Sequence, residues 1–445
     1  MRVVLRDFWI VDEGNAFFGL LVVENGIIKN ILHDANNIPD AGMIIDGKRF
    51  APSAVLMPAF IDLHAHFREP GFPEKEVLES ASLAAVAGGF VTVVCMANTK
   101  PVIDTLDSAI ALKARSDIAA LIDLYPVLSL TKGMEGRELS GIVDVPTADA
   151  GSPALPLMLS EDGRDIADDA LFLAAMGEAR RLGIPVSCHC DFGGSEAEAQ
   201  KKAGGPRSQW SRTEENVAVR RAIDLGKKAG CHVHIAHVST QEAAEIIRTA
   251  KKNKANGFTL TCEATPHHIG ATEEDAQRMG DESYGRVNPP LRSEADRMAI
   301  IAAINDGTID AIATDHAPHG EADKAAGAPG FSGLETAFAI CLSHLALQSA
   351  PQFAPNADSA AEMRRLSALL SAHPARILGL QDRGRIAEGL RADLVIADTH
   401  AAWKVKPEQF RSRGKCSPFA GRELKGKVVM TLNAGSVVFA GDGNA

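Results

Sequence analysis

The middle of the chain alternates short apolar runs with longer amphipathic stretches. Between residues 56 and 384, eight runs rich in branched and aromatic residues recur: 59–66, 90–96, 121–130, 155–161, 184–190, 232–239, 258–265 and 309–315. Stretches with helical spacing of apolar positions lie between them, including 78–89, 168–183, 215–230 and 239–253. Apolar strands that alternate with helices are typical of a parallel sheet buried on both faces. Eight such units predict an α/β fold of the (β/α)8 TIM-like barrel type, with a doubly wound open sheet as the competing fold.

The two ends of the chain show a different pattern. Residues 1–55 contain short strand-like runs separated by turn signals such as Glu24-Asn25-Gly26, and residues 385–445 repeat that character. Because neither end alone can enclose a stable core, we expect both ends to pair into one small β-sandwich domain. The predicted organisation is therefore a composite β-sandwich of residues 1–55 plus 385–445 and a (β/α)8 barrel of residues 56–384.

Charge and composition narrow the class of partner. The 445 residues carry a formal net charge of −11, and basic residues form only short pairs such as Lys251-Lys252. This pattern argues against nucleic acid and against an anionic membrane as partners, whereas a locally positive pocket can still bind a small anionic substrate. No uncharged apolar run reaches the roughly 18 residues of a membrane span, and the first ten residues lack the features of a signal peptide. The odd number of cysteines, mostly inside strand-like runs, is typical of free thiols in a reducing compartment, so we expect a cytoplasmic protein.

Polar side chains gather where the apolar runs of the middle section end. The first run ends in His64-Ala65-His66, and alternate residues of a strand share a face, so both imidazoles can hold one ion. Other runs end in further metal-ligating residues: Glu161, Asp162, His189, His237 and Asp315. Barrel enzymes carry their active sites at this end of the strands. Any one of these residues alone would more often be structural, but their joint placement predicts a metal site.

The donor types indicate the metal and the reaction. Histidine and carboxylate ligands without thiolates suit Zn²⁺, with Mn²⁺ or Co²⁺ as substitutes. Such an ion lowers the pKa of a bound water towards ~7, and the resulting hydroxide attacks a carbonyl carbon. A carboxylate must then relay the proton to the leaving nitrogen, and Asp315 at the last strand end is expected to do so, a role compatible with metal ligation. The pattern predicts a metal-dependent amidohydrolase.

Four further histidines near the ends of the sixth and seventh runs are not predicted to bind the metal. His232 and His234 precede His237 by odd numbers of residues, so they are interpreted as packing or helix-side residues. His267 and His268 follow the seventh run, where they are candidates for hydrogen-bond donors behind the metal ligands.

Longer motifs resemble the class I dihydroorotases. They are PAFIDLHAHFREPG (58–71), GGFVTVVCMANTKPVIDT (88–105), SEDG (160–163), HVST (237–240), NPPLR (288–292), ATDHAPH (313–319) and SPFAG (417–421). The resemblance extends from about residue 45 to 440, whereas H-x-H with T-D-H alone would indicate only the amidohydrolase superfamily. It implies the reversible interconversion of L-dihydroorotate and N-carbamoyl-L-aspartate, a step of pyrimidine biosynthesis. It also implies a homodimer and a possible association with aspartate carbamoyltransferase.

The resemblance further implies roles for individual residues. Those that match metal ligands are His64, His66, Asp162, His189, His237 and Asp315, of which Asp315 also matches the general acid/base. Arg68, Asn98 and His319 match groups that hold the α-carboxylate of the substrate. Arg68 follows His66 by two residues, which places it on the same expected strand face, and its planar fork suits a carboxylate. Asn288 matches a position that contacts the pyrimidine ring, and Gly330 lies in a loosely matched substrate loop.

Several alternatives stay open at this point. Hydantoinase-like and allantoinase-like relatives carry a carboxylated lysine in the fourth run, where residues 155–163 have no lysine, so a carboxylate must replace it. Asp162 matches that ligand, Glu161 is its competitor, and one ion or two ions bridged by Asp162 both fit. Phe192 stands where the family usually has an acidic residue. The alternative functions are another cyclic-amide or ureide hydrolase, or a structural partner of aspartate carbamoyltransferase with little activity of its own.

Overall fold

The computed structural model describes residues 1–33, 41–147, 156–191, 207–253, 255–279, 284–346 and 357–441. The eight predicted runs of the middle section all form strands, which are β6 (Phe60–Ala65), β7 (Phe90–Cys95), β8 (Asp123–Pro126), β9 (Leu159–Ser160), β10 (Val186–Cys188), β11 (His232–Ile235), β12 (Thr259–Ala264) and β13 (Ala311–Ile312). Consecutive strands pair in parallel from β6 to β8 and from β9 to β13. Parallel bridges between Leu128 and Leu159 and between Ala65 and His316 join the remaining edges. The strands therefore follow one another around the ring of a (β/α)8 barrel, as predicted.

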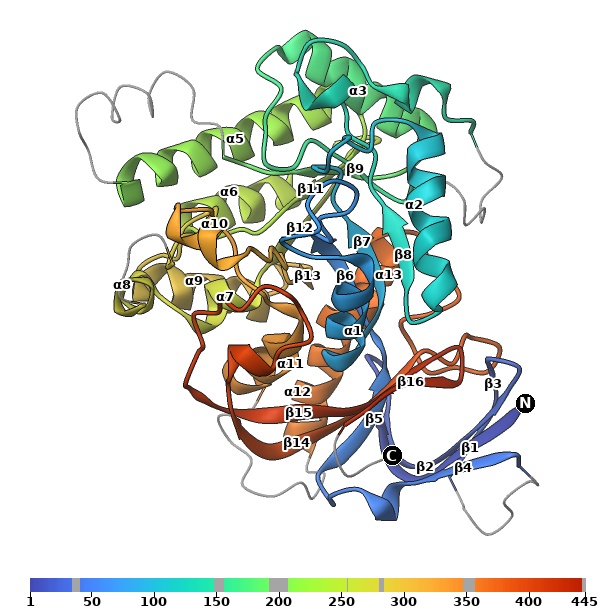
Figure 1. Cartoon of the computed structure of the whole chain (residues 1–445). Coiled ribbons are helices and arrows are strands. Elements are labelled where there is room, and N and C mark those ends of the chain that lie inside the picture. The colour runs from blue at the N-terminus through green and yellow to red at the C-terminus, as the bar shows by residue number, and fades with distance from the viewer. Residues whose placement is uncertain are drawn as a thin grey trace.

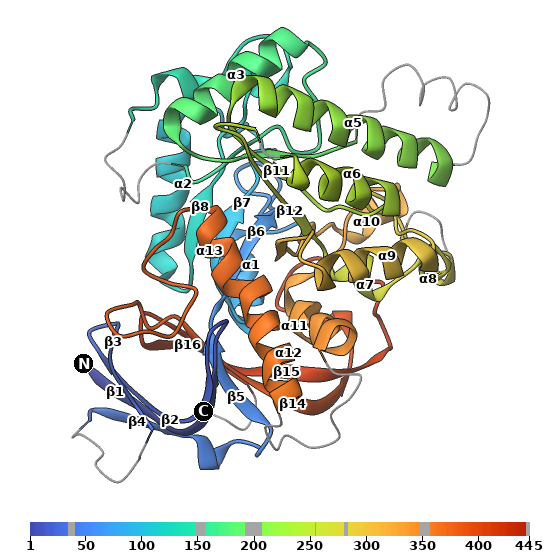
Figure 2. The same cartoon turned by 180° about the vertical axis from the view of Figure 1, so that it is seen from behind.

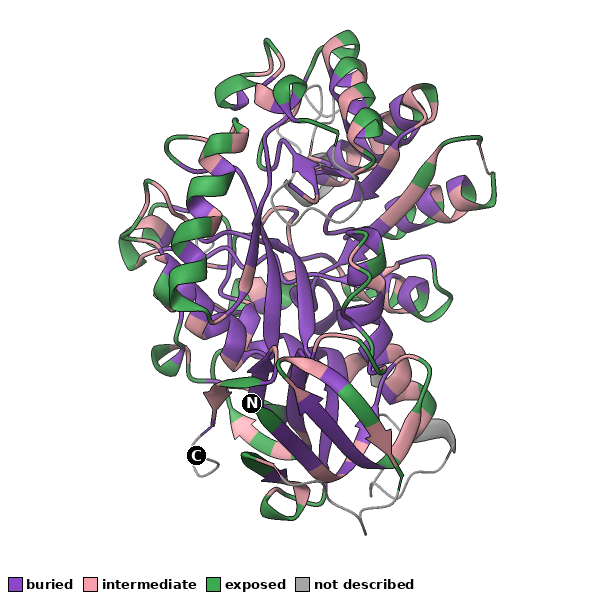
Figure 3. Ribbon diagram, turned by 90° about the vertical axis from the view of Figure 1, so that its right-hand side faces the viewer, coloured by how far each residue is buried: buried purple, intermediate pink, exposed green. Residues whose placement is uncertain are grey.

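Helices cover the outside of this ring (Figures 1 and 2). They are α1 (Leu78–Ala87), α2 (Leu106–Ala119), α3 (Asp169–Leu182), α5 (Arg207–Ala229), α6 (Gln241–Lys252), α7 (Pro266–Gly270), α8 (Glu273–Arg278), α9 (Glu294–Asn305), α10 (Glu321–Ala325), α11 (Ala337–Cys341), α12 (Ala357–Ser367) and α13 (His373–Ile377). Local sequence fixes their ends: the Asp168 carboxylate caps α3 by accepting from the backbone of Ala170 and Leu171, and Gly183 ends it at φ +71°. Figure 3 shows buried strands inside and longer outer helices that are buried on one side and exposed on the other, whereas the short helices α7 and α11 are buried throughout.

Both chain ends pair into one domain built from strands, as predicted, and its described strands form one continuous sheet where a sandwich was expected. Its strands are β1 (Arg2–Val11), β2 (Ala16–Glu24), β3 (Ile27–Leu32), β4 (Met43–Asp46), β5 (Ala54–Pro58), β14 (Leu394–Lys404), β15 (Glu423–Asn433) and β16 (Ser436–Ala440). They form one continuous sheet in the order β16-β15-β14-β5-β1-β2-β3, and β4 also pairs with β1. A shared apolar core includes Leu5, Leu56, Leu394 and Leu432, all without exposed surface. Since this core draws on both termini, neither end could bury its apolar residues alone.

Strand β5 joins the sheet domain to the barrel. Its alternate side chains divide between two cores, with Ala54 and Leu56 in the sheet core and Val55 and Met57 in the barrel core. The division of the chain at residues 55 and 385 stays a prediction. No helix in the described part of the chain combines the length and the apolar character that a membrane span requires.

Candidate metal centre

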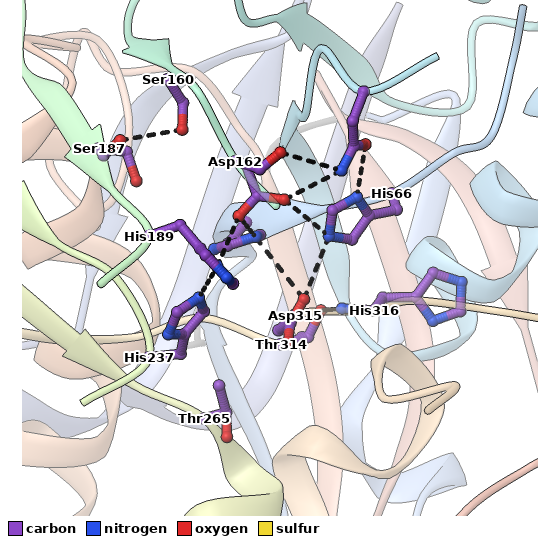
Figure 4. A network of polar contacts seen from close by, with 12 residues as sticks. His66, Ser160, Asp162, Ser187, His189, His237, Thr265, Thr314, Asp315 and His316 are labelled. Atoms are coloured by element: carbon purple, nitrogen blue, oxygen red, sulfur yellow. Dashed lines mark hydrogen bonds and ion pairs between the residues drawn. The ribbon is translucent and has the colours of Figure 1, made fainter. Parts of the chain in front are cut away.

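Imidazoles and carboxylates converge where the barrel strands end (Figure 4). Asp162 lies beside the first pair of histidines, with its Oδ1 3.2 Å from His64 Nε2 and its Oδ2 3.5 Å from His66 Nε2. Asp315 faces the same pair, its Oδ1 lying 3.6 Å from His64 Nε2 and 3.2 Å from His66 Nε2. All four side chains are buried. These contacts place the predicted ligands of the first, fourth and eighth strands in one cluster.

A second pair of histidines meets the same aspartate. His189 Nδ1 lies 3.3 Å from Asp162 Oδ1 and 2.7 Å from His237 Nε2. Two groups of potential ligand atoms result, one of His64, His66 and Asp162 and one of Asp162, His189 and His237, with the atoms of each group within 4.8 Å of one another. Asp162 belongs to both groups. The structure therefore brings together all six residues that the sequence predicts as ligands.

Backbone geometry turns two of these side chains into the site. Asp315 and His237 each follow the end of a strand and adopt left-handed conformations, with φ of +45° and +36°. Such φ values are uncommon outside glycine and cost local energy, so the surrounding contacts must hold them. For Asp315 the neighbouring backbone supplies this support, because the His316 carbonyl accepts a hydrogen bond from the His66 amide at 2.8 Å.

A buried polar network stands behind His64. Its Nδ1 lies 3.2 Å from Glu263 Oε1, and the other oxygen of Glu263 lies 3.0 Å from His234 Nε2. His234 Nδ1 continues the network to Thr261 Oγ1 at 2.8 Å. Burial raises the pKa of Glu263, but its contacts with His234 and His64 outweigh burial and lower the pKa to about 2. The Glu263 carboxylate fixes the ring of His64 and leaves its Nε2 to face the site.

The interpretation of His234 as a packing or helix-side residue is wrong. The regular strand β11 ends at Ile235, and His237 has a positive φ, so counting back from His237 by twos does not give the direction of His234. Sequence reasoning also missed Glu263. The signal available for it was a single charged residue inside the apolar run 258–265, on the strand whose Thr261 pairs in register with His234.

Asn98 and Glu161 take up different positions around Asp162. The Asn98 amide donates from Nδ2 to Asp162 Oδ2 at 3.1 Å, and its Oδ1 lies 3.0 Å from His66 Nδ1. Asn98 thus orients two candidate ligands, while its predicted contact with a substrate carboxylate stays a prediction. Glu161 instead accepts hydrogen bonds from the Leu130 and Thr131 backbone amides and from the Thr131 hydroxyl. Its oxygens are thereby engaged outside the cluster, which leaves Asp162 as the carboxylate of the fourth strand.

The charges of the cluster depend on one another. Burial raises the pKa of Asp162, but His64 and His189 outweigh it and hold that pKa well below its usual range. For Asp315, burial acts the same way and His66 and His64 outweigh it, so its pKa is also lowered. Burial lowers the pKa of His189, but Asp162 and Asp191 outweigh burial and raise that pKa to about 10. The pKa of His237 is lowered to about 3 by burial and by the neighbouring His189. Both aspartates are therefore anionic at neutral pH.

The residues present fit a divalent metal. His64 Nε2 is buried and makes no hydrogen bond within the described residues, although carboxylate oxygens of Asp162 and Asp315 lie close to it. A buried polar atom without a hydrogen bond is costly unless another partner satisfies it. Imidazole nitrogens and carboxylate oxygens without a thiolate form the donor set that Zn²⁺ and similar ions take in proteins.

Arg68 and His319 form a polar pair beside the candidate metal centre. The expectation that Arg68 shares the strand face of His66 is wrong, because β6 ends at Ala65 and Arg68 lies beyond it with a φ of +62°. Its Nε donates to the Pro318 carbonyl at 3.2 Å, and its terminal nitrogen lies 3.1 Å from His319 Nε2. The buried Nδ1 of His319 has no hydrogen-bond partner in the described part of the chain. An anion at this position could therefore meet both side chains.

The remaining predicted substrate residues lie in two loops near this pair. Asn288 is half-buried in the loop before α9. Gly330 has a φ of +138° and packs so closely on Ala317 that a Cβ would lie 2.6 Å from the Ala317 carbonyl oxygen. His268 contacts Thr265 Oγ1 and the Pro289 carbonyl, which places it behind the Asn288 loop. Phe192 lies outside the described residues.

Comparison with known proteins places this site in a family. Residues 55–438 match the amidohydrolase family. The dihydroorotase of Clostridium acetobutylicum is 37% identical over 98% of this chain and 99% of its own length, and that of Clostridium botulinum is 35% identical over 99% of this chain and its whole length. This chain belongs to the dihydroorotase family of amidohydrolases. Like its family, it is a hydrolase.

Solved structures of other amidohydrolases share the fold of this dihydroorotase family member. The L-hydantoinase (dihydropyrimidinase) of Arthrobacter aurescens superimposes with a TM-score of 0.81 at 25% identity, covering 98% of this chain and 95% of that one. The match includes both the barrel and the terminal sheet. The architecture predicted from the sequence is thereby confirmed.

Proposed function

We propose that this chain is a dihydroorotase that reversibly hydrolyses the cyclic amide of L-dihydroorotate to N-carbamoyl-L-aspartate. The observation that carries the proposal is the pair of Arg68 and His319 beside the metal centre, 3.1 Å apart. Dihydroorotate has a carboxylate next to its ring, whereas hydantoin and allantoin have none. A guanidinium suits a carboxylate through two parallel hydrogen bonds. Relatives named dihydroorotase over the whole chain support the same substrate.

The residues that would hold the metal are His64, His66, Asp162, His189, His237 and Asp315. When bound, a divalent ion polarises water and the substrate carbonyl as a Lewis acid. Asp315 is anionic, so its carboxylate can accept a proton from the attacking water and deliver it to the ring amide nitrogen. In the reverse direction the same carboxylate removes the proton from the carbamoyl nitrogen.

The other residues bind and orient. Arg68 and His319 would hold the substrate carboxylate, and Asn288 and Gly330 would contact the ring and its substituents. Asn98 holds His66 and Asp162 in place through its two amide atoms. Burial of the ligands excludes bulk water, which strengthens each of these polar contacts.

Zn²⁺ is the ion that we propose for this donor set, with Mn²⁺ or Co²⁺ as substitutes. Asp162 belongs to both ligand groups, so the site could hold one ion or two, and elemental analysis of metal per chain separates these cases. The homodimer, the association with aspartate carbamoyltransferase and the cytoplasmic location stay predictions.

Substrate profiling tests the proposed function. The zinc-loaded protein is assayed for ring opening of dihydroorotate, hydantoin and allantoin, each with and without aspartate carbamoyltransferase. We expect turnover of dihydroorotate that exceeds that of the other two substrates. Ring opening of hydantoin or allantoin with none of dihydroorotate would contradict the proposal, and inactivity on all three in both conditions would favour a structural role.

A further inference from the structure

Lys324 is a lysine buried behind the substrate loops. It belongs to α10 and is only 1% exposed. Its Nζ donates to three backbone carbonyl oxygens, those of Arg286 at 3.1 Å, Ala328 at 2.8 Å and Gly330 at 3.0 Å. The ammonium group also lies 5.2 Å from the centre of the Phe331 ring. An ammonium has three donors and no acceptor, so this arrangement uses its full hydrogen-bonding capacity.

The three acceptors belong to two separate loops. Arg286 stands two residues before Asn288, and Ala328 and Gly330 flank Pro329 in the loop after α10. The loops also meet directly, since the Gly330 amide donates to the Arg286 carbonyl at 2.9 Å. The Pro329 carbonyl lies 3.0 Å from His319 Nε2. Lys324 therefore joins the backbone behind Asn288 to the backbone behind Gly330 and His319.

A catalytic base at this position would need an unprotonated amine. Three carbonyl oxygens around Nζ favour the ammonium instead, because each of them requires a donor. A buried cation is costly unless it is fully hydrogen-bonded, and here carbonyl dipoles supply the compensation. Burying a charged side chain costs free energy that an apolar residue filling the same space would not cost. Lys324 also stands at the junction of the loops that would meet the substrate.

We propose that Lys324 is a positioning residue for substrate binding, which fixes the Asn288 and Gly330 loops relative to the Arg68–His319 pair. The proposal rests on the proposed function, because it takes these loops to be the walls of the dihydroorotate site. Lys324 lies outside the cluster of metal ligands. Its loss should therefore change substrate affinity and leave metal binding intact.

The test compares Lys324→Met with Lys251→Met as a matched control. Lys251 is a half-buried lysine of α6 whose Nζ also donates to a backbone carbonyl, that of Thr308 at 2.8 Å. Thr308 precedes β13 whereas Asp315 follows it, so this contact lies at the opposite end of the strand from the site and its loss should not move the loops. For Lys324→Met we expect a KM for dihydroorotate raised by about tenfold or more, with kcat within about threefold of wild type. Metal content per chain should equal that of wild type, and Lys324→Arg should recover part of the lost affinity. For Lys251→Met we expect KM and kcat equal to those of wild type.

A folded, metal-loaded Lys324→Met protein with wild-type KM would overturn the proposal, as would an equal rise of KM in the Lys251→Met control. If Lys324→Met does not fold, Lys324→Gln carries the same comparison, because it keeps one amide donor on a shorter side chain. A raised KM with normal metal content then supports the proposal, and a wild-type KM overturns it. The wild-type protein is assayed in the same experiment. If wild type does not turn over dihydroorotate, the proposed function is wrong, and this outcome differs from an active wild type with an unaltered KM in Lys324→Met.

Discussion

The two histidine pairs of the metal centre are held by different kinds of partner. On one side, His64 is fixed by Glu263 and His66 by Asn98, and Glu263 has no exposed surface. On the other side, His189 Nε2 contacts Asp191, whose side chain is 38% exposed. A partner on the second ring nitrogen sets the orientation of a ligand histidine, and a buried partner does so more rigidly than a solvated one. The His64–His66 side is therefore the more preorganised part of the site.

The proposed proton-transfer group, Asp315, lies on this preorganised side. Asp315 contacts both His64 and His66, and both ring nitrogens are within 3.6 Å of its carboxylate. Asp162 connects this side to His189 on the other. Catalysis depends on precise placement of the proton-transfer group, so a rigid scaffold is most valuable where Asp315 stands. We therefore expect the His64–His66 side to orient the proton-transfer group and the His189–His237 side mainly to complete the set of metal ligands.

The largest effect should come from removing the proposed base on the preorganised side. Asp315→Asn keeps the shape of the side chain but removes its ability to take a proton, so we expect kcat to fall by roughly 10²–10⁴-fold. Metal content per chain should stay near that of wild type. Steady-state kinetics with elemental analysis checks both. Near-normal kcat would show that another residue moves the proton.

Loss of the guanidinium should weaken substrate binding on the same side. Arg68→Met removes charge-assisted hydrogen bonds to the substrate carboxylate, each worth about 1.5–3 kcal/mol, so KM should rise by roughly 10–100-fold for both dihydroorotate and carbamoyl aspartate. The effect on kcat should be small, because the carboxylate is bound equally in the ground and transition states. An unchanged KM in either direction of the reaction would count against this role.

Glu263→Gln tests the buried support of His64. The amide keeps the size of the side chain but can no longer accept from both His64 and His234, so we expect metal affinity to fall by about 10–100-fold. Chelator competition measures this affinity without relying on turnover, and the melting temperature reports whether the fold is retained. An unaltered affinity in a folded variant would remove the basis for calling this side preorganised.

The smallest effect should follow from Asp191→Asn on the other side. The side chain of Asp191 is partly exposed, and exposed ion pairs contribute little, so metal affinity should fall by only about twofold to fivefold. The same chelator competition, run beside Glu263→Gln, compares the two sides directly. Equal losses in the two variants would mean that both histidine pairs are held with similar rigidity.

The fold could be predicted from the sequence because it depends on the local pattern of apolar and polar residues, which short stretches of the chain contain. Eight apolar runs separated by amphipathic stretches specify a barrel, and the runs at both ends specify a sheet that needs both termini. Residues at strand ends, such as His64 and Asp162, could be placed at one mouth because parallel strands all end on the same side.

What the sequence could not predict depends on contacts across the barrel and on local departures from regular strands. Arg68 lies off the expected face because β6 ends before it, and the direction of His234 was hidden by the backbone turn at His237. Glu263 supports His64 from a strand 199 residues away in the sequence. Partners of this kind emerge only when the strands and loops are placed together.

Removal and return of the metal test the central claim most directly. The protein is treated with a chelator, dialysed and assayed for dihydroorotate ring opening before and after addition of Zn²⁺, with zinc per chain measured on the same samples. We predict that turnover disappears with the metal and returns in proportion to bound zinc. Full activity in the metal-free protein, or a zinc-loaded protein that leaves dihydroorotate unchanged, would contradict it.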